Sequence, residues 1–163
     1  MIACLTFLML IAVIGTSFAL NARLSNYCSF PPCCKSEINP PYTNAEKKSC
    51  PGHSECDDFN GCTYQGEFAF CGKKSHDYVI GTNIVSFFST HGDVNKYKNK
   101  KLRITQGSKT IDAIVCDTCS DNDCRGCCTK NAGESGYLID MESNTYARFG
   151  ATDGPVTWNC LNC

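Results

Sequence analysis

The stretch YLIDMESNTYARFGATDGPVTW, residues 137–158, contains the densest series of structural signals in the chain. Its apolar segment from Leu138 to Met141 predicts a short strand. Ser143 is a suitable N-cap for a short helix over residues 144–149, and Gly150 can end that helix. Residues 154–159 then predict a closing strand, so this stretch favours a small β-rich domain with one short helix.

Further short β-type segments lie upstream of this stretch. Polar and apolar residues alternate over 101–105, as in a half-buried strand, and residues 106–109 supply a hairpin turn. Residues 84–88 fit either a strand or a buried helical turn. We expect strands at residues 66–71, 78–80, 84–88, 101–105, 110–116, 138–141 and 154–159. About six strands with one short helix can form a small closed barrel.

The N-terminal third of the sequence has a different composition. Residues 1–19 have the apolar core and small-residue site of a signal peptide, with cleavage after Ala19. Residues 20–61 are rich in Cys, Pro and Asn, which predicts an irregular, disulfide-knotted extension. A small carbohydrate-binding module is the alternative, with Tyr27, Phe30, Tyr42 and Phe59 as its aromatic platform. The expected organisation is a signal peptide, this extension, and a barrel domain over residues 62–163.

Cysteine usage indicates an exported protein stabilised by disulfides. Of the 15 cysteines, Cys4 belongs to the predicted signal peptide, which leaves an even number. We expect all of the others to be paired, in a pattern that the sequence does not define. They are Cys28, Cys33, Cys34, Cys50, Cys56, Cys62, Cys71, Cys116, Cys119, Cys124, Cys127, Cys128, Cys160 and Cys163.

The two Cys-x-x-Cys pairs at 116–119 and 124–127 invite comparison with zinc sites. Only four residues separate the pairs, whereas zinc ribbons usually have about 15–20 between them. Together with the predicted export, this spacing favours disulfides over a metal. The sequence therefore predicts neither a metal site nor a cofactor.

Charge and hydropathy exclude several classes of protein. The formal net charge is −1, with acids and bases mixed along the chain, which argues against a nucleic-acid-binding protein. No segment after the signal peptide is apolar for long enough to cross a membrane. The basic run at residues 95–101 could meet an acidic polymer or be a solvated loop. We expect a secreted, extracellular monomer.

Several of these segments resemble the RlpA-like double-psi β-barrel superfamily, which includes expansins, kiwellins and barwin. Residues 115–119, Val-Cys-Asp-Thr-Cys, are similar to the family's Val-x-Asp-x-Cys turn. Residues 137–158 are similar to its Asp-Leu-Ser strand end, short helix and closing Pro-Val-x-Trp strand. Residues 66–72 correspond more weakly to its first strand. The resemblance covers residues 62–160 and implies a mainly β, six-stranded double-psi barrel with a short helix.

The same resemblance implies a site at the rim of a groove. Asp140 occupies the position at which glycan-cleaving relatives keep a general acid, although a carboxylate there could instead accept backbone N–H bonds. Glu67, Asp117 and Thr118 would line the groove with Asp140. A second catalytic carboxylate is not found at the matching position, where residues 71–74 read Cys-Gly-Lys-Lys; Glu67 or Asp117 could substitute.

Three functions follow from this resemblance. The first is a non-hydrolytic, expansin-like protein that binds or loosens cell-wall polysaccharide, either β-glucan or chitin. The second is a kiwellin-like or barwin-like defence or effector protein that binds a foreign secreted protein. The third is a glycan-cleaving enzyme with Asp140 as its general acid. Trp158, the only tryptophan, would either stack on sugars or pack in the core.

Overall fold

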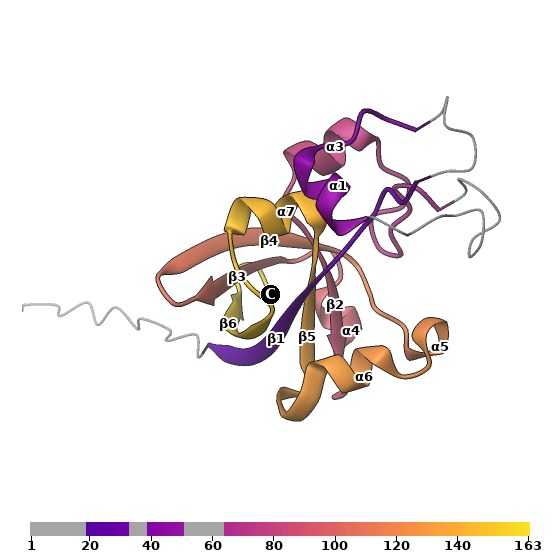
Figure 1. The fold of residues 1–163 in the computed structure, drawn as a ribbon. Coiled ribbons are helices and arrows are strands. Elements are labelled where there is room, and N and C mark those ends of the chain that lie inside the picture. Colours follow the sequence, from indigo (N-terminus) through magenta and orange to yellow (C-terminus); the bar gives the residue numbers. More distant parts are fainter. Residues whose placement is uncertain (1–18, 33–38, 51–63) are drawn as a thin grey trace, which may run out of the picture.

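The computed structural model describes residues 19–32, 39–50 and 64–163. Its six strands close into a barrel in the order β1-β5-β2-β4-β3-β6 (Figure 1). The pairs β1/β5 and β2/β4 are parallel, and the other neighbouring pairs are antiparallel. The strands are β1 (Leu20–Tyr27), β2 (Ile84–Ser89), β3 (Lys101–Gln106), β4 (Lys109–Asp117), β5 (Tyr137–Glu142) and β6 (Gly154–Cys160). The expectation of a mainly β, six-stranded protein is confirmed.

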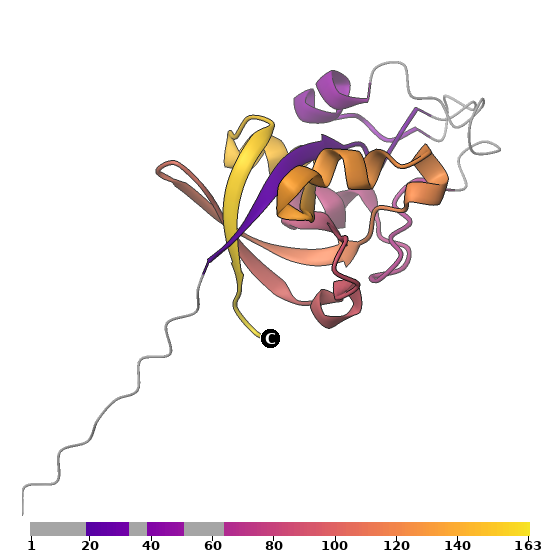
Figure 2. The same ribbon diagram turned by 90° about the horizontal axis from the view of Figure 1, so that it is seen from below.

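Short helices lie against two regions of the barrel. At one end α1 (Asn44–Ser49), α3 (His76–Gly81) and α7 (Ser143–Phe149) gather, as Figure 1 shows. In the view from below, α6 (Cys127–Ala132) lies alongside β1 (Figure 2), and it also contacts β5 and β2. The remaining helical turns are α4 (Val94–Tyr97), α5 (Asp121–Cys124) and the 3-10 turn η2 (Gly133–Ser135).

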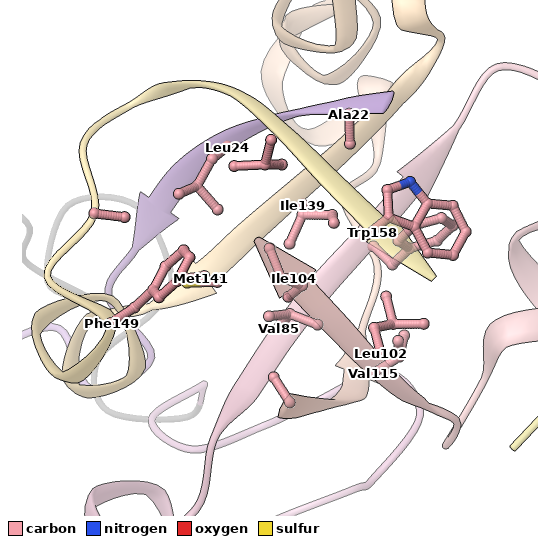
Figure 3. Close-up of a cluster of buried hydrophobic side chains, with 14 of the residues drawn as sticks. Ala22, Leu24, Val85, Leu102, Ile104, Val115, Ile139, Met141, Phe149 and Trp158 are labelled. Atoms are coloured by element: carbon pink, nitrogen blue, oxygen red, sulfur yellow. The ribbon is translucent and has the colours of Figure 1, made fainter. Parts of the chain in front are cut away.

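The barrel interior is filled by apolar side chains from all six strands (Figure 3). Trp158 on β6 is only 1% exposed, so of the two expected roles it packs in the core and does not stack on sugars. Its ring packs edge-on against Phe87 and Tyr97, at centroid distances of 5.0 and 5.1 Å. Because strand side chains alternate between faces, this inward set leaves the intervening residues on the outer surface of the barrel.

The first strand of the barrel lies where the sequence predicted an irregular extension. Within β1, Ala22 and Leu24 are buried in the core, and the strand pairs with β5 and β6. The expected boundary between an extension (20–61) and a barrel (62–163) is therefore wrong, since the barrel begins at Leu20. Within β1 only two residues point inward, so the sequence shows little of the alternation expected for a strand. The neighbouring segment rich in Cys and Pro weakens this signal further.

Residues 66–72 form turns and not the expected first strand. Gly66 and Gly72 adopt positive φ angles of 68° and 66°, and the Gly72 amide bonds to the Phe68 carbonyl. A Cβ at Gly66 would lie 2.4 Å from the Lys74 carbonyl oxygen, so this turn requires glycine. The segment still contacts the barrel, because the amides of Phe70 and Cys71 both donate to the Cys116 carbonyl.

The other predicted elements are confirmed with one exception. Residues 78–80 belong to helix α3, whose N-cap Ser75 accepts from the Tyr78 amide. Residues 84–88 are a strand, and the expected hairpin is formed by β3 and β4. Helix α7 ends at Gly150 in the left-handed conformation, as predicted, but its N-cap is Glu142 and not the expected Ser143. Among the described residues, no helix has the length and apolar character needed to cross a membrane.

Five disulfides lie within the described residues. They are Cys28–Cys50, Cys71–Cys116, Cys119–Cys128, Cys124–Cys127 and Cys160–Cys163. The four cysteines of the two Cys-x-x-Cys motifs are all in disulfides, but only Cys124–Cys127 forms within its motif, since Cys116 pairs with Cys71 and Cys119 with Cys128. Residues 1–18 of the predicted signal peptide and the cysteines at 33, 34, 56 and 62 lie outside the described residues.

Candidate functional site

Four polar residues are aligned across four neighbouring strands. In the register of the sheet, Ser25 on β1 faces Asp140 on β5, Asp140 faces Ser86 on β2, and Ser86 faces Asp117 on β4. We call these four residues the polar row. Ile139 and Met141, on either side of Asp140, both point into the core, so Asp140 lies on the outer surface.

A register shift brings Asp117 into the polar row. The irregularity lies between Val85 and Ser86, opposite the end of β4, and such bulges re-aim a side chain. The Asp117 carboxylate accepts hydrogen bonds of 2.9 Å from the amides of Ala69 and Thr118. Ala69 belongs to the turn segment outside the barrel, which places the Asp117 carboxylate on the outer surface near Asp140.

Asp140 is half-buried and has an unusual proton affinity. Burial raises its pKa from 3.8 to about 7, and the negative charges of Asp153 and Asp117 act in the same direction. The Ser25 hydroxyl, which donates to Asp140 at 2.9 Å, opposes this increase. A carboxyl group with this pKa exists in both protonation states near neutral pH, as a general acid must.

Asp117 is less suited to activate a water molecule. Burial raises its pKa, while the two amide hydrogen bonds lower it. Two strand spacings separate it from Asp140, or about 10 Å between the backbones. Because its Oδ1 atom already accepts two N–H groups, Asp117 is fixed in place as an acceptor at the end of the polar row.

Thr118 and Glu67 do not extend the polar row. The Thr118 hydroxyl donates to the Phe87 carbonyl at 3.0 Å, which ties the end of β4 to β2. Glu67 lies in the turn segment, where its carboxylate is 3.4 Å from the Lys73 ammonium group and its side chain is 44% exposed. The structure therefore aligns Asp140 and Asp117 in one row, two strands apart, and leaves Glu67 in solvent.

The sequence pattern did not place Tyr27, the last residue of β1, at the barrel site. Its hydroxyl is buried and has no hydrogen-bond partner among the described residues. Burial raises its pKa well above the usual value, and the charges of Asp117, Glu142 and Asp140 raise it further. Tyr27 therefore contributes a neutral phenol beside the acidic end of the polar row. It was missed as a barrel residue because β1 was missed.

A pocket of about 380 Å³ adjoins the polar row between β1 and α6. Its walls include Ser25 of the row, Asp153, and the cations Arg23 and Lys130. In the described part of the chain, neither cation forms an ion pair. Asp140 is not in the wall itself, but Ser25 connects it to the pocket through their hydrogen bond.

A second set of polar residues is buried and joins the capping helices. The Glu46 carboxylate on α1 lies 2.8 Å from His76 Nε2 on α3 and accepts from the Asn144 side-chain amide on α7. Asn144 also bonds to Glu142, whose pKa is raised by burial. His76 is thus part of the packing that holds α1 and α3 to the barrel.

Comparisons with known proteins identify no family for this chain. No family model matches it, and no curated protein matches it. Among solved structures, Streptomyces papain inhibitor is similar with 12% identity and a TM-score of 0.42, over 92% of this chain and 98% of that chain. Similarity this low assigns neither a family nor a function.

Proposed function

We propose that this protein is a secreted, diverged double-psi barrel that binds cell-wall polysaccharide without cleaving it. The polar row on the outer surface carries this proposal. Ser25, Asp117 and Asp140 are partly exposed there on three strands of a rigid barrel, whereas Ser86 between them is buried. Sites of this kind fix the orientation of a ligand through a few well-placed polar groups.

The ligand class follows from the chemistry of the polar row and its pocket. Sugar hydroxyls both donate and accept hydrogen bonds, and so match the partly exposed side chains of Ser25, Asp140 and Asp117. The pocket of about 380 Å³ beside Ser25 could take a sugar unit, with Arg23 and Lys130 as donors. Neutral chains of β-glucan or chitin are the proposed ligands, and this binding requires no cofactor.

Glycan cleavage is a second candidate, which the pKa of about 7 at Asp140 favours. Cleavage with inversion requires a second carboxylate that activates water, about 6.5–9.5 Å from the acid. Asp117 is the nearest candidate in the polar row, but two amides already bond to its carboxylate. This occupied carboxylate is the reason why we place binding before catalysis.

A bulky residue in the wall of the pocket should weaken binding. We expect Ser25→Trp to weaken adsorption to insoluble cellulose or chitin by about tenfold or more, because the indole would fill the pocket and displace the hydrogen bond to Asp140. Ser108→Trp, in the exposed β3–β4 turn, is the matched control and should bind like the wild type. Adsorption isotherms of the three proteins provide the measurement.

Three outcomes of this experiment separate the candidate functions. Absence of wild-type adsorption to both polymers would refute polysaccharide binding and leave capture of a foreign protein as the alternative. Equal loss in both tryptophan variants would place the binding surface elsewhere. Release of reducing ends from the polymer, lost in Asp140→Asn, would indicate cleavage in place of simple binding.

A further inference from the structure

Two disulfides lie side by side in the hairpin formed by α5 and α6. Cys119–Cys128 and Cys124–Cys127 bring four sulfur atoms within 4.8 Å of one another. Between the two bonds, Cys124 Sγ lies 3.7 Å from Cys128 Sγ. Disulfide exchange proceeds by attack of a thiolate on a neighbouring disulfide sulfur. A thiolate freed at Cys124 would therefore meet the second disulfide directly.

Exposure distinguishes Cys124–Cys127 from Cys28–Cys50 and Cys71–Cys116, although not from Cys160–Cys163. Cys124 and Cys127 are both partly exposed, whereas Cys28–Cys50 and Cys71–Cys116 each have one buried member, Cys50 and Cys116. Cys128, whose sulfur lies nearest to Cys124 in the second disulfide, is fully buried. An external thiol can therefore reach the first disulfide, and only an internal thiol can easily reach Cys128.

The local backbone favours departure of the Cys124 sulfur. The Cys127 amide donates to Cys124 Sγ at 3.2 Å, and such a bond stabilises a thiolate more than a disulfide sulfur. Arg125, between the two cysteines, has a left-handed φ of 56°, a conformation that is unfavourable for a non-glycine residue. Opening of the Cys124–Cys127 ring would allow this residue to relax.

We propose that Cys124–Cys127 is a thiol-exchange site that passes the exchange on to Cys119–Cys128. The thiolate of a small monothiol attacks Cys127 Sγ and forms a mixed disulfide, and the electron pair of the broken bond stays on Cys124 Sγ. Cys124 Sγ then attacks Cys128 Sγ, which forms a Cys124–Cys128 disulfide and releases Cys119 as a thiolate. Solvent takes the proton of the monothiol and returns one to Cys119.

Mass mapping after brief exposure to reduced glutathione tests this relay. The full chain, with its disulfides formed, is treated at pH 8, quenched with acid, and alkylated. We expect glutathione on Cys127, a Cys124–Cys128 link, and at least about tenfold more alkylation at Cys119 than at Cys124. More alkylation at Cys124, with Cys119–Cys128 intact, would overturn the proposal, as would initial opening of Cys71–Cys116.

A double variant and an internal comparison complete the test. With Cys119 and Cys128 both replaced by serine, the relay has no second disulfide, so the alkylated residue should be Cys124. Absence of alkylation at Cys124 would contradict the attack of the monothiol on Cys127. The Cys160–Cys163 disulfide has the same spacing as Cys124–Cys127. Any exchange there should leave the free thiol within that pair. Intact Cys28–Cys50 and Cys71–Cys116 links show that the variant has folded.

Discussion

The Asp140→Asn variant should be more stable than the wild type at pH 8 by about 4 kcal/mol, and equally stable near pH 4. A pKa raised from 3.8 to about 7 means that the folded protein holds a proton which the unfolded chain releases. Each tenfold change in proton affinity corresponds to about 1.4 kcal/mol. Ionisation of this carboxyl group therefore lowers the free energy of unfolding by about 4 kcal/mol.

The direction of this pH dependence follows from the raised pKa. The contribution of protonated Asp140 to stability is complete below about pH 4 and is lost as the pH rises to about 7. Asparagine cannot ionise, and its carbonyl oxygen can still accept from Ser25. The difference between the two unfolding free energies should therefore grow from pH 4 to pH 7 and then level off.

Urea unfolding with intact disulfides, followed over pH 4–8, measures this difference. Asp77→Asn is a suitable control because Asp77 is an exposed carboxylate on α3. It should change stability by less than about 0.5 kcal/mol at every pH. Parallel stability curves for the wild type and Asp140→Asn would contradict the raised pKa, and with it the desolvated site.

Trp158→Ala should destabilise the fold by about 3–5 kcal/mol, the usual cost of removing a fully buried large aromatic side chain. The indole lies at the centre of an aromatic group and contacts the rings of Phe87, Tyr97 and Tyr137 at 5.0–5.3 Å between centroids. Truncation would leave a cavity in the barrel that these rings can fill only by shifting one another.

The neighbouring residue offers a matched control for this variant. Thr157 is exposed on the same strand, so Thr157→Ala should cost less than about 1 kcal/mol. Urea unfolding at fixed pH with intact disulfides compares the two variants with the wild type. A cost below about 1 kcal/mol for Trp158→Ala would show that the tryptophan is not part of the core.

Much of the fold could be predicted from local signals. The β3–β4 hairpin and the run from β5 through α7 to β6 have clear alternation, caps and turn residues. The first strand could not be predicted, because two buried residues within a short segment give too weak a period. The partners that make β1 a strand, β5 and β6, lie more than a hundred residues away in the sequence.

The candidate site was predictable only in part, for a related reason. Asp140 and Asp117 were expected from the resemblance of their segments to a known family, and the structure places them in one polar row. Ser86 and Tyr27 lie beside these aspartates because of strand register and the packing of distant segments. No local sequence pattern indicates either placement. Glu67 lies away from the row because residues 66–72 form turns, whereas the sequence pattern predicts a strand there.

The most direct test of the polar row is an NMR titration of the aspartate carboxyl carbons, with and without a soluble β-glucan or chitin oligosaccharide. We predict an Asp140 pKa of about 7 in the free protein. Addition of the oligosaccharide should perturb Asp140, Asp117 and the Ser25 region before other parts of the surface. An Asp140 pKa near 4, or perturbations confined to another face, would contradict the proposed site.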